Sequence, residues 1–166
     1  MKTSVRVAVI LLTVVGCVGC DQLTKSVARN HLAPGMSVSL LSGVIRLQRA
    51  ENPGAFLSLG DVLPTNTRRV LFTFGGALLV VGTAFWALRS RRLSSPQIVG
   101  AALLAGGGLS NLIDRVTQGG SVTDFLNIGA GPIRTGIFNC ADMALMLGVA
   151  ILILSGSVAT RLLRRR

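Results

Sequence analysis

Two aspartates in the C-terminal half of the chain suggest a specific reaction. Asp124 lies in the strand-like stretch "VTDFLN", and Asp142 follows "FNCA" at the start of an apolar run. When two carboxyl groups share one water molecule, one keeps its proton while the ionised partner activates the water to attack a carbonyl. The pair then titrates as a unit. Asp124 and Asp142 are therefore candidates for the catalytic pair of an aspartyl hydrolase.

Both aspartates also have simpler interpretations. Asn139 stands where a helix N-cap would, and an acidic residue three positions later resembles a capping box and suits the helix dipole. In these interpretations Asp142 serves solely as a helix cap, and Asp124 serves solely to form a turn.

Three further polar clusters lie at the ends of apolar stretches, where polar groups are costly and functional by default. Their residues are Asp21, Gln22 and Lys25, then Asn52 and Gly54, then Asn111, Asp114 and Arg115. Helical spacing puts Asn111, Asp114 and Arg115 on one face, and pairs Asp21 with Lys25. Alternatives remain: a purely interfacial Asp21–Lys25 pair, a local Asp114–Arg115 ion pair, and Asn111 as interhelical glue. We expect Asp21, Lys25, Asn52, Gly54, Asn111, Arg115 and Asn139 to bind substrate or support the site.

Other kinds of site are disfavoured. A single histidine, His31, excludes a His-pair zinc site and argues against a Ser-His triad. The three cysteines, Cys17, Cys20 and Cys140, form no disulfide framework, and small apolar packing explains Cys17 and Cys20 best. The net charge of +11 invites a nucleic-acid partner, but the chain has no Tyr and one Trp to stack bases. We expect no metal, no cofactor and no nucleic acid.

The elements that must position these residues are membrane helices. Only 14% of the 166 residues are charged, whereas a soluble domain carries roughly 25%. Charge-free runs cover 70–88, 93–113 and 143–160, each about long enough to cross roughly 30 Å of hydrocarbon as a helix. A shorter run, 7–20, begins after Lys2 and Arg6, and no helix breaker follows it before Asn30, so this helix can continue to about Arg29.

The distribution of charge predicts the orientation. Basic residues are dense in short segments beside span ends, which marks the cytoplasmic side; they are Lys2, Arg6, Arg89, Arg91, Arg92, Arg161 and Arg164 to Arg166. All six acidic residues fall in or beside the two other segments. We therefore expect both termini in the cytoplasm and any carboxylate chemistry at the outer face.

The predicted fold is an all-α integral membrane bundle of four helices, forming one domain over 1–166. The spans are approximately 5–28, 69–89, 96–114 and 139–160, with outer segments at 29–68 and 115–138. The stretch "MSVSLLSGVIRLQRAENPGAF" is rich in β-branched residues and predicts a small antiparallel sheet on the outer membrane surface. A short strand is expected around Asp124, and Gly106 to Gly108 should let a neighbouring helix approach closely.

The start of the chain also resembles a lipoprotein signal peptide, with small residues before Cys17 and Cys20. One alternative is therefore a lipid-anchored protein cut at one of these cysteines. Another is a small transporter or structural membrane protein, although the ionisable groups gather at one interface and do not line a path across the bilayer.

Five motifs in register resemble the lipoprotein signal peptidase (signal peptidase II) family. They are D-Q-x-x-K at 21–25, N-x-G-A at 52–55, N-x-x-D-R at 111–115, V-x-D-F at 122–125 and F-N-x-A-D at 138–142. The similarity extends from Asp21 to about Val149. Ser110 and Met143 depart from the residues common in the family.

The resemblance implies an aspartyl endopeptidase of the bacterial cytoplasmic (inner) membrane. It would cut prolipoproteins just before their diacylglyceryl-modified cysteine, with prolipoproteins and membrane lipids as partners, and nothing demands more than a monomer. Asn111, Arg115 and Asn139 would orient substrate or the aspartates, and the sheet around Asn52 to Phe56 would clamp the substrate chain. We expect Asp142, near a helix N-terminus, to be ionised and Asp124 to be protonated.

Overall fold

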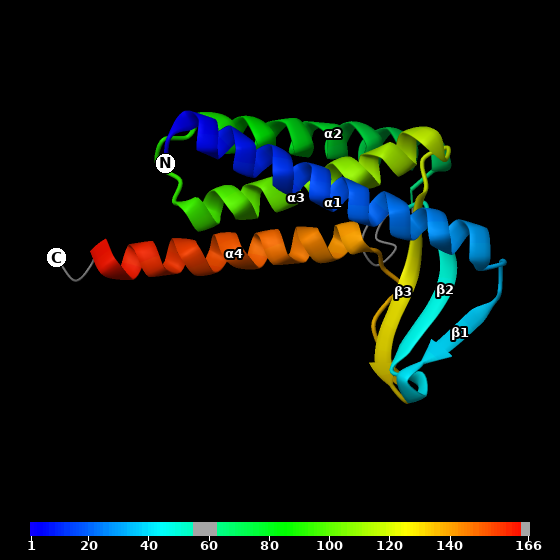
Figure 1. Cartoon of the computed structure of the whole chain (residues 1–166). Coiled ribbons are helices and arrows are strands. Elements are labelled where there is room, and N and C mark those ends of the chain that lie inside the picture. Colours follow the sequence, from blue (N-terminus) through cyan, green and yellow to red (C-terminus); the bar gives the residue numbers. More distant parts are fainter. Residues whose placement is uncertain (55–62, 164–166) are drawn as a thin grey trace.

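The computed structural model describes residues 1–54 and 63–163, with side chains to Gly156, as four helices joined to a small sheet (Figure 1). The helices are α1 (Thr3–His31), α2 (Thr65–Arg89), α3 (Ser95–Thr117) and α4 (Cys140–Leu163). The strands are β1 (Ser37–Leu40), β2 (Ile45–Asn52), β3 (Val122–Ala130) and β4 (Ile133–Arg134), with a 3-10 turn η1 (Leu41–Gly43) between the first two. Ala55 and Phe56 of the predicted site, Asp61 among the six acidic residues, and Arg164 to Arg166 lie outside the described residues.

The first helix continues without a break through Cys20. It runs for 29 residues, and Leu32 ends it in an extended conformation. Pro34 follows two residues later, and helices usually end at or before the residue that precedes a proline. Asp21 and Lys25, four residues apart, form an ion pair within this helix. The predicted continuation of the helix beyond the apolar run is confirmed.

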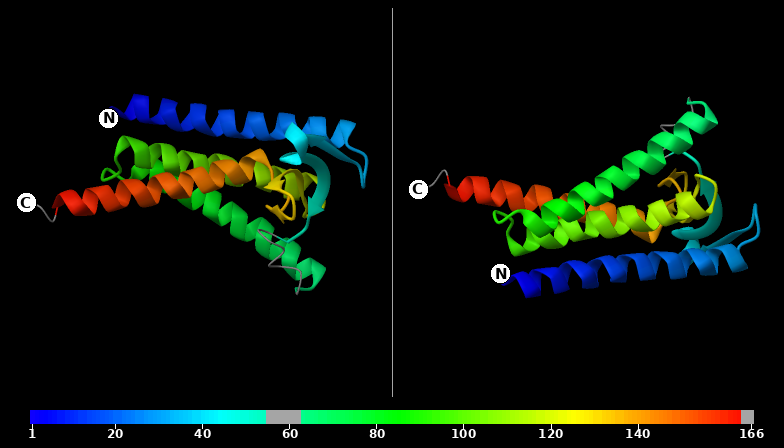
Figure 2. Two further views of the ribbon diagram at one scale, coloured as in Figure 1. Left: turned by 90° about the horizontal axis from the view of Figure 1, so that it is seen from below. Right: turned by 90° about the horizontal axis from the view of Figure 1, so that it is seen from above.

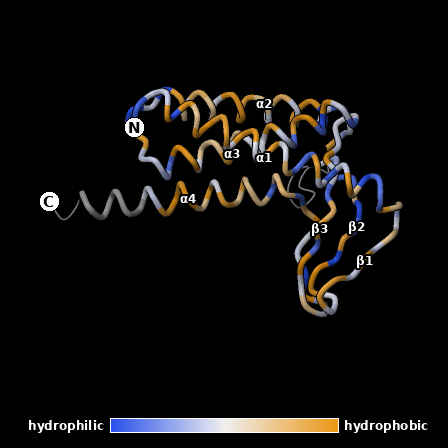
Figure 3. The backbone as a smooth tube through the Cα atoms, viewed as in Figure 1, coloured by the Kyte–Doolittle hydropathy of each residue, from blue (hydrophilic) through white to orange (hydrophobic). Residues whose placement is uncertain are grey.

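Hydrophobic residues occupy much of the four helices, as the colouring of Figure 3 shows, and many of their aliphatic and aromatic side chains are exposed. Among the described residues, α1, α2 and α3 are long and apolar enough to cross a membrane, and α4 contributes a further apolar stretch over Cys140–Gly156. A soluble protein buries such side chains, because exposing them to water is unfavourable. The chain is therefore a multi-pass membrane protein.

Helix α3 lies between α1 and α2 in both views of Figure 2 and also packs along α4. Its three consecutive glycines each face a different neighbour. A Cβ atom would lie 2.9 Å from the Cβ of Cys17 at Gly106, 2.6 Å from the carbonyl oxygen of Ala141 at Gly107, and 2.8 Å from a methyl carbon of Val80 at Gly108. Close helix approach at these glycines was predicted, and the structure extends it to three helices at once.

The strands form one antiparallel sheet in the order β1-β2-β3-β4, attached to one end of the bundle (Figure 1). The predicted sheet and the predicted strand around Asp124 are confirmed, and they belong to the same sheet. Asp124 lies inside β3 opposite Ala50, beside an irregularity in β2 between Leu47 and Ala50. The alternative in which Asp124 only forms a turn is therefore wrong.

Candidate active site

Asn139 connects the two candidate catalytic aspartates. Its side-chain amide donates a hydrogen bond of 2.6 Å to Asp124 Oδ1, and its backbone N–H donates one of 3.2 Å to Asp142 Oδ2. Asn139 is fully buried and Asp124 is 2% exposed. Strand β3 and the start of α4 thus place both carboxyl groups within hydrogen-bonding distance of the same residue, Asn139.

The contact between Asn139 and Asp142 is also a helix cap. Asn139 Oδ1 accepts the backbone N–H of Asp142 at 2.9 Å while Asp142 Oδ2 accepts that of Asn139, which is the reciprocal pattern of a capping box. The capping interpretation is correct, but it occupies only one carboxylate oxygen. Asp142 Oδ1 instead accepts a hydrogen bond of 3.0 Å from the side-chain amide of Asn111.

Asn52 holds Asp124 from the other side. It lies at the end of β2, and its amide donates to Asp124 Oδ2 at 3.0 Å. The backbone N–H of Gly54 donates to Asn52 Oδ1 at 3.0 Å and so fixes which end of the amide faces the aspartate. Asn52 and Gly54 therefore act together on Asp124.

Burial changes the acidity of Asp124. Removal from water, and next the negative charge of Asp142, raise the pKa of Asp124 from its usual value to about 6. The hydrogen bonds from Asn52 and Asn139 and the charge of Lys25 act in the opposite direction, because each favours the ionised form.

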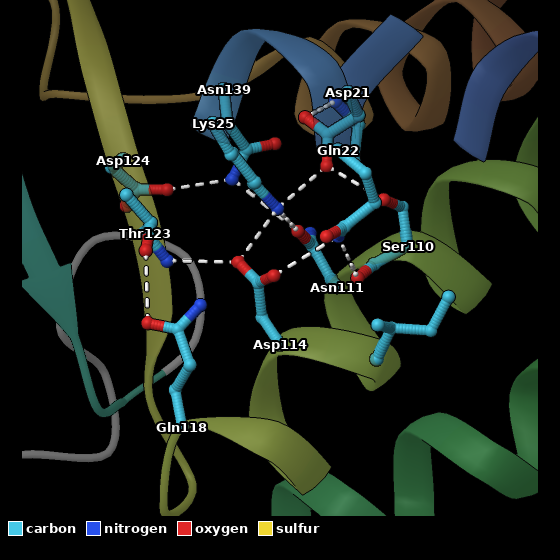
Figure 4. A network of polar contacts seen from close by, with 12 residues as sticks. Asp21, Gln22, Lys25, Ser110, Asn111, Asp114, Gln118, Thr123, Asp124 and Asn139 are labelled. Carbon is cyan, nitrogen blue, oxygen red and sulfur yellow. Dashed lines mark hydrogen bonds and ion pairs between the residues drawn. The ribbon is translucent and has the colours of Figure 1, made fainter. Parts of the chain in front are cut away.

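A buried ion cluster lies beside Asp124 and Asn139 (Figure 4). Lys25 Nζ lies 2.6 Å from Asp21 Oδ2 and 3.0 Å from Asp114 Oδ2, and all three side chains are at most 1% exposed. A buried charge without a partner costs several kcal/mol, so each of the three depends on the others. The predicted Asp21–Lys25 pair is part of this larger cluster.

The other oxygens of the cluster are also satisfied. Asp21 accepts hydrogen bonds from the hydroxyl of Ser110 at 2.7 Å and from the backbone N–H of Ala141 at 2.8 Å. Asp114 accepts one from the side chain of Gln22 and one from the backbone N–H of Thr123, each at 3.0 Å. The cluster thereby ties α1, α3, the start of α4 and β3 together.

Asn111 joins the ion cluster to the aspartates. Its carbonyl oxygen accepts a hydrogen bond of 2.9 Å from Lys25 Nζ and a longer one of 3.3 Å from Asn139. Because the oxygen of the amide is held by Lys25, its nitrogen is directed to Asp142. Asn111 therefore does more than connect two helices.

The local ion pair between Asp114 and Arg115 is a wrong prediction. Asp114 turns inward to Lys25, whereas Arg115 donates to the backbone oxygen of Gly120 at 3.0 Å and lies 5.5 Å from the ring centre of Phe72. Adjacent residues on a helix point about 100° apart, so Asp114 can contact Lys25 on α1 while Arg115 contacts Gly120 in the segment after α3.

Several members of this network were missed by sequence reasoning. Thr123 is buried, its N–H binds Asp114, and its hydroxyl lies within reach of Glu51 and Arg29; no motif marks it. Ser110 stood out only as a departure, yet it is fully buried and bonded to Asp21. The other departure, Met143, is 52% exposed on α4.

Among the described residues, no group of three or more Asp, Glu, His or Cys side chains is arranged to hold a metal ion. The fold and the site define a class: a polytopic membrane protein with two carboxyl groups held together where its helices meet a small sheet. Comparison with known proteins identifies the family. Residues 13–158 match the family model described as signal peptidase (SPase) II, so the chain belongs to that family of membrane peptidases.

Individual relatives agree. Three relatives are named lipoprotein signal peptidase. The protein from Leifsonia xyli is 34% identical to this chain, and the match covers 92% of this chain and 69% of the relative. The corresponding values are 32%, 93% and 94% for Streptococcus pneumoniae, and 36%, 86% and 78% for Gloeobacter violaceus. Two solved structures, each described as a bacterial membrane enzyme structure obtained by the in meso method, are 26% identical to this chain. Their TM-scores are 0.80 (91% of this chain, 88% of the other) and 0.77 (88% and 90%).

Proposed function

We propose that this chain is an aspartyl endopeptidase of the bacterial cytoplasmic membrane. It removes the signal peptide from prolipoproteins by cutting just before the diacylglyceryl-modified cysteine. The observation that carries this proposal is the pairing of Asp124 and Asp142 through Asn139, in a chain of the signal peptidase II family.

In the proposed reaction, Asp142 is ionised and Asp124 carries the proton. Asp142 takes a proton from a water molecule, and the oxygen of that water attacks the scissile carbonyl. At the same time Asp124 donates its proton to the carbonyl oxygen. The tetrahedral intermediate then collapses: Asp142 gives its proton to the leaving amine, and the hydroxyl proton of the intermediate returns to Asp124. The raised pKa of Asp124 supports its role as the proton holder, and the helix N-terminus beside Asp142 favours the charge there. A titration in which Asp142 keeps its proton to higher pH than Asp124 would overturn this division of roles.

The supporting residues have distinct proposed tasks. Asn52 and Asn139 hold Asp124, and Asn111 holds Asp142. Gly54 fixes Asn52, and Lys25 with Asp21 fixes Asn111. Arg115, anchored on Gly120, is proposed to orient substrate near the site.

The proposed topology has four spans, both termini in the cytoplasm and the site at the outer face. The substrate is itself a membrane helix with a lipidated residue at the interface, so a site at that level can receive both parts. The sheet would lie on the outer surface: aliphatic side chains are exposed at its far end, where Leu41 is 70% and Ile133 is 81% exposed. The enzyme is proposed to act as a monomer without a cofactor.

The alternatives receive less support. Cutting at Cys17 or Cys20 would divide a continuous helix and remove Asp21 and Lys25 from the bundle or leave them at a free end. A transporter needs polar groups along a path across the bilayer, whereas the buried charged groups described gather at one end. The intact mass of the purified protein distinguishes a lipid-anchored protein from the proposed enzyme, because a lipid-anchored protein would have a shortened chain and an attached lipid.

The direct test uses cells that depend on this copy of the enzyme. Asp124→Asn and Asp142→Asn each keep the shape of the side chain but remove its acid–base function. We expect both variants to accumulate lipid-modified precursors with their signal peptides attached, as seen by immunoblot and mass spectrometry. Normal processing in either variant, at matched expression, would refute the aspartyl mechanism.

A further inference from the structure

Two of the three cysteines meet where α1 and α4 come together. Cys140 begins α4, and Cys20 lies at the same level on α1. The hydroxyl of Thr24 donates to Cys140 Sγ at 3.5 Å, and it also bonds the backbone oxygen of Cys20 at 2.8 Å. Thr24 lies four residues after Cys20 on the same face of α1, so the Cys140 thiol faces the part of α1 that carries Cys20.

The backbones near these cysteines are fixed by the ion cluster. Asp21, the residue after Cys20, accepts the N–H of Ala141, the residue after Cys140, at 2.8 Å. A disulfide needs two Cα atoms about 4.4–6.8 Å apart with side chains directed at each other. Cys140 Sγ faces the side of α1 that carries Cys20, and the bond between Ala141 and Asp21 keeps the two helix segments close.

Cys17 lies in a different environment. Its Cβ atom is 2.9 Å from the position that a Cβ would take at Gly106, so it packs against α3. Cys20, by contrast, is exposed on the surface of α1. The approach to Cys140 is therefore particular to Cys20, and Cys17 offers a matched control.

We propose that Cys20 and Cys140 form a disulfide that links α1 to α4 beside the active site. The proposal rests on the orientation given under the proposed function, because disulfides persist in oxidising compartments outside the cytoplasm. The oxidant is a disulfide of a thiol–disulfide exchange protein. One S–S bond forms between Cys20 and Cys140 while the partner's S–S bond is reduced to two thiols, so two electrons and two protons pass to the partner.

The bond would act as a staple. It would close a long loop of chain, which restricts the unfolded state, and it would tie α1 to the residue that follows Asn139. Because the two helix segments are already close while the hydrogen bonds of the site are made, oxidation should leave catalysis nearly unchanged. We expect the thermal midpoint of the oxidised protein to exceed that of the reduced protein by several degrees.

The test counts free thiols in cells by acid quenching followed by a maleimide-polyethylene glycol reagent in denaturing detergent. The chain has three cysteines; wild type should gain one label without reduction and three after it. Cys17→Ser should gain no label without reduction and two labels after it. Cys20→Ser and Cys140→Ser should each gain two labels in both conditions.

Three labels on the unreduced wild-type chain would overturn the proposal. So would a disulfide-linked dimer on a non-reducing gel, or a bond that forms only when purified protein meets oxidised glutathione. Precursor processing is measured in the same cells. Loss of the disulfide with normal processing in wild-type cells refutes only the disulfide. Normal processing in Asp124→Asn or Asp142→Asn cells refutes the proposed peptidase mechanism, whatever the state of the thiols.

Discussion

At the scale of single residues, the environment of the two aspartates makes them unequal. Asp124 is enclosed and receives side-chain amides from Asn52 and Asn139, whereas Asp142 shares its carboxylate between a helix cap and Asn111. The pKa of Asp124 is about 6, so its proton is lost as pH rises through that value. A reaction that needs this proton must slow on the alkaline side.

The first prediction concerns pH. kcat/KM for a lipidated peptide should fall as pH rises past about 6, the pKa of Asp124. In Asn52→Ala the ionised form loses a hydrogen bond, so the pKa rises and the falling limb should move to higher pH, with a lower maximum. The measurement is a pH series of kcat/KM in one detergent. A limb that stays in place, or moves to lower pH, would contradict the assigned role of Asp124.

At the scale of elements, the ion cluster of Asp21, Lys25 and Asp114 holds the helices that carry the site. Removing one member of a buried ion pair costs about 3–5 kcal/mol because its partner remains charged and unpaired. The same cluster fixes the amide of Asn111 through Lys25. Its loss should therefore reach both stability and catalysis.

The second prediction tests this coupling. Lys25→Met should lower the free energy of unfolding by about 3–5 kcal/mol and reduce kcat. Adding Asp21→Asn removes one unpaired charge and should restore part of the stability, as thermal unfolding in detergent would show. Lys2→Met, near the N-terminus and exposed, is the control and should behave as wild type. Additive losses in the double variant would argue against a shared cluster.

The third prediction concerns the contact between α3 and α4. A Cβ at Gly107 would lie 2.6 Å from the backbone oxygen of Ala141, so Gly107→Ala must push the start of α4, with Asn139 and Asp142, away from α3. We expect a loss of about 1–3 kcal/mol and a marked loss of activity. Gly82→Ala, where nothing lies within 4 Å, should be neutral or slightly stabilising, because alanine favours helix. Equal effects at the two positions would exclude the steric explanation.

At the scale of the whole molecule, the sheet extends sideways from one end of the bundle, across the direction of the helices (Figure 1). The far end of the sheet carries exposed Leu40, Leu41, Val44 and Ile133. Arg134 donates hydrogen bonds to Gly43, Val44 and Gly129 and so ties the two hairpin turns together there. A rigid, aliphatic end beside membrane helices suits contact with lipid.

The fourth prediction places a reporter at this end. Trp86 is the single tryptophan, so Trp86→Phe gives a silent background for Leu41→Trp. In vesicles, its emission should be blue-shifted and quenched by lipids brominated on the acyl chain. Ser37→Trp, on an exposed polar position of β1, should be quenched by aqueous iodide instead. A blue-shifted Leu41→Trp that brominated lipid does not quench would indicate a protein contact and contradict the membrane-surface placement.

Sequence patterns determined a large part of this protein. Charge-free runs marked the helices, and the spacing of Asp21 and Lys25 indicated that the first helix continues beyond Cys20. The polar motifs at the helix ends identified the site residues as candidates. These features are local, because helix formation and burial in lipid depend on residues near one another in the chain.

Only the tertiary structure decided which polar groups meet. Asp114 turns to Lys25 rather than to its neighbour Arg115, and Thr123 and Ser110 join the buried network without a motif to mark them. "VVGCVGCDQLTK" shows the same division: its helix could be predicted, but the approach of Cys140 to the side of α1 that carries Cys20 could not. Partners brought together from distant positions depend on how the helices pack, and that packing is set by close contacts such as those at Gly106 to Gly108.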